Sequence, residues 1–189
     1  MKDYWILIGI LAIGVFVVFV GLANYSPKLA SKQVSATIVN PNLPQRIGPV
    51  EAYPNFQLNP GKLSSLDPNK TCLDPNWRTS SVRPPVSYTN ALKKQDITLY
   101  HYADTNMADY ELDHIVSLEV CGDPKDPTNL WPQLYNLIWN GKDIGAKVKD
   151  KVENLMAKMV KARQLTIQEA ADNLRFDWVN VGMKYGIIK

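Results

Sequence analysis

Two short stretches of the chain contain the residue types that a metal-dependent hydrolytic site requires. Asp113 stands next to His114 in an apolar segment, and Asn129 opens a second apolar segment. Carboxylate and amide oxygens bind hard divalent cations, and a neutral imidazole can take a proton from water. The pattern predicts phosphodiester cleavage, with Asp113 and Asn129 near a metal and His114 as the general base. Asn129 fits equally well as an anchor for its loop.

The elements around these residues are two β-strands joined by a loop. Alternation along a strand places Glu111 and Asp113 on one face and His114 on the other. Asp113 and His114 therefore flank one site only if the strand ends or twists there. The loop over residues 121–128 is rich in Gly, Pro and Asp, which are turn residues, so its closure would bring Asn129 close to Asp113.

Two helices are predicted after the strands. The first carries an apolar stripe at helical spacing and begins at Asp143 as N-cap; the stripe is Ile144, Val148, Val152, Leu155 and Met159. Asp150 and Glu153 lie on another face of this helix and are candidate metal ligands if the helix packs under the strands. The alternative is an acidic pair in solvent among neighbouring lysines. The second helix begins with a capping box over residues 166–169.

The basic residues are candidates for contacts with nucleic acid. Residues 141–189 contain 10 Lys and Arg against 6 Asp and Glu, and the whole chain has a formal charge of +3. A solvated basic surface explains each candidate equally well. The candidate phosphate contacts are Arg83, Lys93, Lys94, Lys147 and Lys149.

The N-terminal part reads as a membrane segment followed by a spacer. Residues 5–23 form a run of 19 residues without a charge, which is long enough to cross a bilayer. Gly21-Leu22-Ala23 would suit signal-peptide cleavage, but the run is longer than a usual signal core. A retained anchor is the preferred interpretation, and release by cleavage is the alternative. Residues 24–59 are rich in proline and predict an extended tether, which leaves residues 60–189 as the folded domain.

The two cysteines, Cys72 and Cys121, exclude a four-cysteine zinc site and a dense disulfide framework. The length of 189 residues suits one compact domain with appendages. A monomer is the default expectation, since nothing in the sequence indicates an oligomer.

The two stretches together resemble a known family. Tyr110-Glu-Leu-Asp-His-Ile-Val-Ser-Leu-Glu119, then Gly122, then Asn129-Leu-Trp-Pro-Gln133 is similar to the signature of HNH-type endonucleases, in an exported or membrane-anchored bacterial and phage branch. The resemblance implies an α+β fold with a ββα-metal core and additional C-terminal helices. It further implies that Asp113 binds Mg²⁺ or Mn²⁺, that His114 activates water and that Asn129 orders the site. DNA is the expected substrate ahead of RNA, and the domain is expected outside the cytoplasm.

The chain departs from this family at a few positions. Relatives often have a histidine in the long helix where Ala157 stands, so Asp150, Glu153 or water would have to replace that ligand. Cys121 replaces the first glycine of a Gly-Gly loop, which suggests a disulfide between Cys72 and Cys121. The missing histidine also raises an alternative function, a catalytically inactive nuclease-like domain that binds nucleic acid or protein at a membrane.

Overall fold

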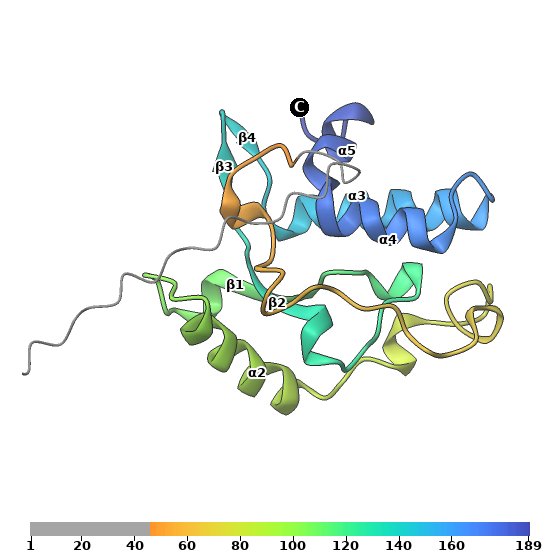
Figure 1. Cartoon of the computed structure of the whole chain (residues 1–189), viewed down its shortest axis with the longest axis horizontal. Coiled ribbons are helices and arrows are strands. Elements are labelled where there is room, and N and C mark those ends of the chain that lie inside the picture. Colours follow the sequence, from red (N-terminus) through yellow and green to blue (C-terminus); the bar gives the residue numbers. More distant parts are fainter. Residues whose placement is uncertain (1–45) are drawn as a thin grey trace, which may run out of the picture. The chain divides into compact units, whose positions relative to one another are not determined.

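The computed structural model describes residues 46–189 (Figure 1). The expected membrane segment and most of the expected tether lie outside these residues. Within residues 46–189, no helix is long and apolar enough to cross a membrane. The elements in this range are α2 (Val86–Leu99), β1 (Tyr110–His114), β2 (Leu130–Leu134), β3 (Ile138–Trp139), β4 (Lys142–Asp143), α3 (Ala146–Lys161), α4 (Ile167–Phe176) and α5 (Trp178–Lys184).

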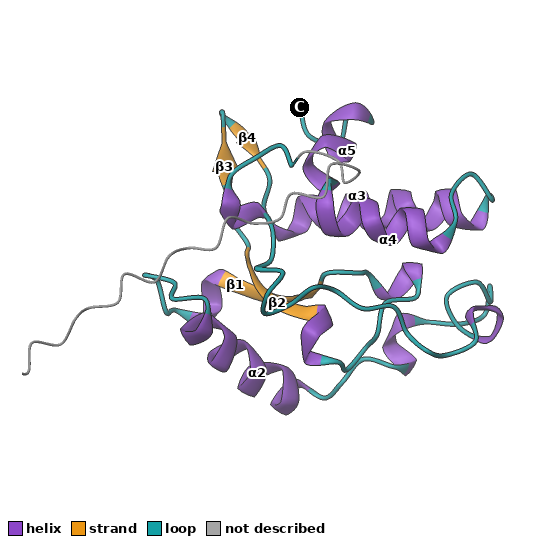
Figure 2. Cartoon of the chain, in the orientation of Figure 1, coloured by secondary structure: helices purple, strands orange, loops and turns teal. Residues whose placement is uncertain are grey.

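Strands β1 and β2 form an antiparallel pair that includes both motif stretches. The register runs from Tyr110 opposite Leu134 to His114 opposite Leu130. The connection between them is a long loop with short 3₁₀ turns rather than a tight hairpin (Figure 2). Strands β3 and β4 form a separate small hairpin, whose Asn140 and Gly141 both have positive φ angles, as a two-residue turn requires.

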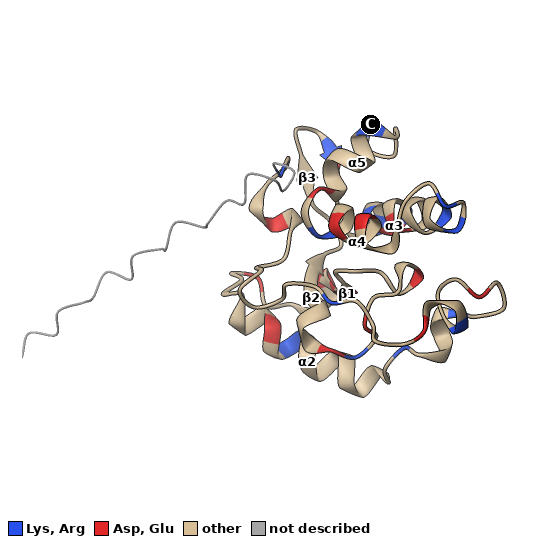
Figure 3. Cartoon of the chain, turned by 45° about the vertical axis from the view of Figure 1, so that its right-hand side comes forward, with Lys and Arg blue, Asp and Glu red and all other residues tan. Residues whose placement is uncertain are grey.

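The β1–β2 pair lies between helices. Helix α2 contacts both strands, and α3 and α4 lie on the opposite side in the views of Figures 1 and 3. Helix α2 runs through residues 97–99 and ends at Leu99. The described residues form helices and two small antiparallel sheets, and the α+β class with a ββα-metal core stays a prediction.

Helix α3 buries the apolar stripe that its spacing predicted. Val148 and Val152 are buried, and Leu155 and Met159 are partly buried against the same core. The helix starts at Ala146 with Gly145 as its N-cap, so the prediction of Asp143 in that role is wrong. Asp143 lies two residues before this N-cap, and its Oδ1 accepts a hydrogen bond from the Gly145 N–H at 2.9 Å.

Helix α4 begins as expected, because Thr166 and Glu169 make both hydrogen bonds of a capping box. The second helix predicted from the sequence is instead two helices, α4 and α5, which meet at Asp177. Trp178 starts α5 and is fully buried, and its indole N–H donates to the carbonyl oxygen of Ala52 at 2.8 Å.

The folded domain begins before residue 60, so the expected end of the tether at residue 59 is wrong. Ala52 and Tyr53 belong to the main core, and Asn59 donates to the Leu130 carbonyl oxygen at 2.8 Å. Within residues 46–59 the chain forms a short 3₁₀ turn but no α-helix or strand, as its prolines indicated. They do not prevent an irregular segment from packing on the core, and this is the physical reason for the correction.

The segment over residues 60–85 is mostly loop and is attached to the β1–β2 connection at several points. Leu63 pairs with Gly122 in an isolated β-bridge. Cys72 and Cys121 form a disulfide, with their Cα atoms 5.3 Å apart. The pairing suggested by the family resemblance is therefore present, and it fixes a loop that leads to Arg83.

Candidate active site

Asp113 and His114 are the last residues of β1, and both are buried. Although neighbouring strand residues normally face opposite ways, both side chains line one cavity, because the strand ends at His114. The cavity has a volume of about 230 Å³. It is lined by Thr79, Arg83, Glu111, Leu112, Asp113, His114, Ser117, Leu118, Glu119, Asp150, Glu153 and Asn154.

The cavity is strongly acidic and brings together the carboxylates that the sequence proposed as metal ligands. Asp113, Asp150 and Glu153 each offer an oxygen atom, and these atoms lie within 4.8 Å of one another. Oxygen donors of this kind suit Mg²⁺ or Mn²⁺. The donor set therefore fits the metal that the family resemblance implies. Asp113 comes from β1 and the other two come from α3.

Burial and mutual repulsion act on these carboxylates. Burial is the largest influence on Glu111 and Asp150 and raises the pKa of each above its ordinary value. The negative charge of Asp113 raises both pKa values further. Burial also raises the pKa of Glu153, against the lowering effect of Lys149. A positive charge placed among them would relieve this repulsion.

Lys149 already places one such charge there, so its predicted role as a phosphate contact is wrong. The side chain is only 2% exposed. Its Nζ donates to Asp113 Oδ2 at 2.6 Å and to the His114 carbonyl oxygen at 3.0 Å, and it forms an ion pair with Glu153. These carboxylates outweigh the effect of burial and raise the pKa of Lys149, which therefore stays charged. The sequence could not show this, because the partner on β1 is 36 positions away.

His114 is held as a neutral imidazole with one free nitrogen. Its Nε2 lies 3.2 Å from the carbonyl oxygen of Pro124. Because a carbonyl oxygen only accepts, we assign the ring proton to Nε2 and the lone pair to Nδ1. Burial, the largest influence, lowers the pKa of His114, and Asp113 partly opposes the shift. The ring is thus neutral at physiological pH and able to accept a proton.

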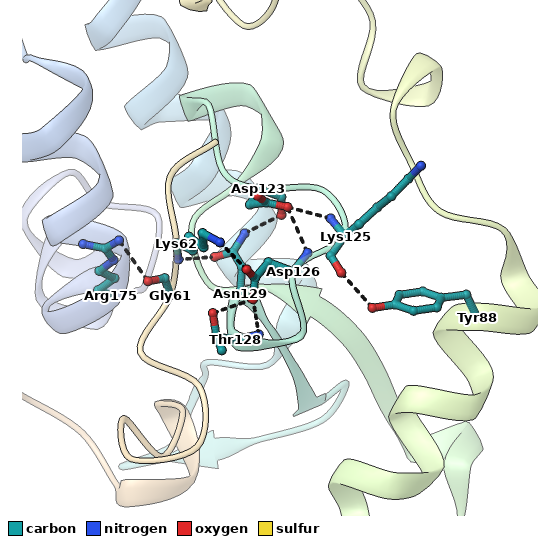
Figure 4. A network of polar contacts seen from close by, with 9 residues as sticks. All are labelled: Gly61, Lys62, Tyr88, Asp123, Lys125, Asp126, Thr128, Asn129 and Arg175. Carbon is teal, nitrogen blue, oxygen red and sulfur yellow. Dashed lines mark hydrogen bonds and ion pairs between the residues drawn. The ribbon is translucent and has the colours of Figure 1, made fainter. Parts of the chain in front are cut away.

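Asn129 is a loop anchor, and the prediction that it binds the metal is wrong. It is fully buried, and its Oδ1 accepts from the N–H groups of Lys62 and Val116, each at 3.0 Å. Its Nδ2 donates to the carbonyl oxygens of Val116 and Asp123. The amide therefore has no lone pair left for a cation. Figure 4 shows Asn129 at the centre of a polar network in the β1–β2 connection.

The same network holds the loop that carries Pro124, the partner of His114. Asp123 Oδ1 accepts from the N–H groups of Lys125 and Asp126, and Asp126 forms an ion pair with Lys62 (Figure 4). Tyr88 of α2 donates to the Lys125 carbonyl oxygen at 2.7 Å. Asn129 thus contributes to the site through the position of its loop, not by touching the reacting groups.

The other candidate phosphate contacts divide into three groups. Arg83 is exposed and lines the cavity, and it forms no ion pair with any residue that the structure describes. Lys93 is occupied, because its Nζ donates to the carbonyl oxygens of Met107 and Tyr110 at 2.8 Å each; this corrects its predicted role. Lys94 and Lys147 are exposed but do not line the cavity, and their contact with nucleic acid stays a prediction.

Glu111 and Glu119 are cavity residues that the sequence did not single out as part of the site. A signal existed for Glu111, since strand alternation places it on the face of Asp113. Ala157, at the position where the family that the sequence resembles often has histidine, is buried and does not line the cavity. The residues that α3 contributes to the cavity are Asp150, Glu153 and Asn154.

In comparisons with known proteins, no protein-family model, no curated protein and no solved structure matches the chain.

Proposed function

We propose that this domain is a metal-dependent endonuclease that hydrolyses phosphodiester bonds in DNA, with RNA as the second substrate to test. One observation carries the proposal. A neutral histidine with a free Nδ1 lines the same cavity as two carboxylates from different elements, Asp113 on β1 and Asp150 on α3. A proton acceptor beside a set of oxygen ligands is what hydrolysis of a phosphodiester needs.

Each residue has a distinct role in the proposed reaction. His114 Nδ1 takes the proton from the water molecule that attacks phosphorus. Asp113, Asp150 and Glu153 would hold Mg²⁺ or Mn²⁺, which when bound supplies positive charge to the phosphate and the leaving oxygen. Arg83, at the cavity wall, donates hydrogen bonds to phosphate oxygens and orients the strand.

We also propose that residues 5–23 anchor the chain in a membrane with the domain outside the cytoplasm. The length of the uncharged run supports the anchor. The Cys72–Cys121 disulfide supports an oxidising compartment. Alkylation of the cells at harvest, followed by a thiol count on the denatured chain, tests the compartment. No free thiol is expected, and two free thiols contradict it. Fractionation separates a retained anchor from a cleaved signal, which would release the domain.

The second candidate function is a nuclease-like domain that binds nucleic acid without cutting it. One observation favours it: a buried Ala157 stands where relatives often place a histidine. This candidate predicts that the protein retains DNA in a salt-sensitive way, with no cleavage in any divalent metal.

A plasmid-cleavage assay on the full-length chain in detergent tests the proposal. We expect supercoiled plasmid to be nicked and linearised with Mg²⁺ or Mn²⁺, to stay intact with chelator, and to be cut again when excess metal is restored. Cleavage that persists in chelator contradicts the metal-dependent mechanism. Retention of the plasmid without cleavage assigns the domain to the second candidate.

A further inference from the structure

Lys149 is a buried lysine whose position packing alone does not require. Its neighbours Val148 and Val152 already hold α3 on the core. Burying an ammonium group is costly unless all its donors find partners. The Lys149 ammonium has three, namely the carboxylates of Asp113 and Glu153 and the carbonyl oxygen of His114. Two of these belong to the consecutive residues at the centre of the proposed site.

The contacts of Lys149 divide the carboxylates into two kinds. The Oδ2 atom of Asp113 accepts a hydrogen bond from Lys149, while its Oδ1 accepts none from any described residue. Glu153, one turn along the same helix, forms an ion pair with Lys149. Asp150 lines the same cavity and forms no ion pair within residues 46–189. Glu153 Oε2, like Asp113 Oδ1, accepts no hydrogen bond from a described residue. Asp113 and Glu153 therefore each share one oxygen with a charge that the protein itself supplies, whereas Asp150 has no such partner among residues 46–189.

We propose that Lys149 is a positioning residue for the reaction, a fixed internal cation that holds Asp113, Glu153 and the His114 main chain and leaves Asp150 as the one carboxylate of the three without an internal counter-ion in the described residues. This inference rests on the proposed metal-dependent function and assigns the largest share of the metal affinity to Asp150. The ammonium holds the end of β1 against α3 before any metal arrives. It also reduces the negative charge that an incoming cation meets.

This role predicts opposite effects on metal binding and on cleavage. Without the ammonium, Asp113 and Glu153 are both released to a divalent cation, so the metal binds more tightly. Cleavage becomes slower, because Asp113 and His114 lose the contacts that fix them relative to the substrate. A lysine that merely stabilised the fold would weaken metal binding and cleavage together.

The first test compares the full-length wild type with Lys149→Met, a variant of similar side-chain length without charge. Mn²⁺ binding is measured by titration calorimetry, folding by circular dichroism, and plasmid cleavage at saturating Mn²⁺. We expect Mn²⁺ to bind at least about tenfold more tightly in the variant. Cleavage should fall by about a hundredfold. Unchanged or weaker Mn²⁺ binding in a folded Lys149→Met protein overturns the inference.

A second pair of variants decides the question if Lys149→Met does not fold. Asp150→Asn and Glu153→Gln each remove one negative charge from the same helix. We expect Asp150→Asn to weaken Mn²⁺ binding at least about tenfold more than Glu153→Gln does, because the charge of Lys149 already lies beside Glu153 and no such charge is paired with Asp150 in the described residues. Equal losses, or a larger loss in Glu153→Gln, overturn the inference.

The outcomes also separate the inference from the proposed function. If the wild type binds Mn²⁺ but does not cleave, the nuclease proposal fails, and the binding isotherms still decide how the carboxylates are divided. If the wild type binds no Mn²⁺, both proposals fail.

Discussion

His114 Nε2 lies 3.2 Å from the carbonyl oxygen of Pro124, and this contact reserves the other ring nitrogen for proton transfer. The carbonyl belongs to the loop that Asn129 ties down, so the orientation of the imidazole depends on the polar network of that loop.

Replacing His114 by Ala should lower the cleavage rate by about a thousandfold, the usual contribution of a general base. The matched control is His101→Asn, because His101 is the other histidine of the chain and is exposed outside the cavity. Asparagine also tolerates its positive φ angle. Plasmid cleavage at saturating metal measures both. Equal losses in the two variants would sink the assignment of the base.

The pH profile of cleavage should reflect the lowered pKa of His114. The imidazole must be neutral to accept a proton, and burial favours the neutral form. Activity should therefore persist as the pH falls through about 6.5, the ordinary histidine value, and be lost only below it. Measuring kcat/KM between about pH 4.5 and 8 checks this expectation. A rise in activity centred above the ordinary histidine value contradicts it.

Asn129→Ala should destabilise the fold without directly removing a metal ligand. The change breaks four hydrogen bonds to backbone groups, two of them buried and two partly buried. We expect the free energy of unfolding to fall by about 2–4 kcal/mol. Chemical denaturation measures the loss, and Mn²⁺ titration at a temperature where the variant is still folded provides the contrast. A large loss of Mn²⁺ affinity with unchanged stability would restore Asn129 as a ligand.

Arg83→Ala should weaken DNA binding more than Lys94→Ala does. Both side chains are exposed, but only Arg83 lines the cavity. Losing one phosphate contact should raise KM and reduce the slope of log affinity against log salt by about 1. Fluorescence anisotropy over a range of salt concentrations measures the slope. If the two variants behave alike, Arg83 belongs to the general basic surface.

The parts of the fold that sequence reasoning recovered depend on local signals. The capping box at Thr166 and Glu169 is complete within four residues, and the apolar stripe of α3 follows from helical spacing. The residue types of Asp113 and His114 single them out as a candidate site, on the condition that the strand ends or twists there. These signals need no knowledge of what lies across the fold.

The parts that it missed depend on partners far along the chain. In the sequence, Lys149 looks like the exposed lysines beside it. Only the structure shows that it is buried and forms an ion pair with Asp113. The sequence does not distinguish Asn129 from a metal ligand, because its Oδ1 accepts a hydrogen bond from the N–H group of Lys62, which is 67 positions away. Ala52 lies among prolines that suggest a spacer, and only its contact with Trp178 shows that it is interior.

That contact between Ala52 and Trp178 joins the start of the folded domain to its final helix, across 126 positions. A protease that sheds the domain by cutting before Val50 would leave this hydrogen bond intact, whereas a cut between Ala52 and residue 60 would separate Ala52 from the domain and expose the Trp178 ring and its N–H. Recombinant fragments follow the same rule. One that begins at residue 60 removes part of the interior, and one that begins at residue 46 keeps it.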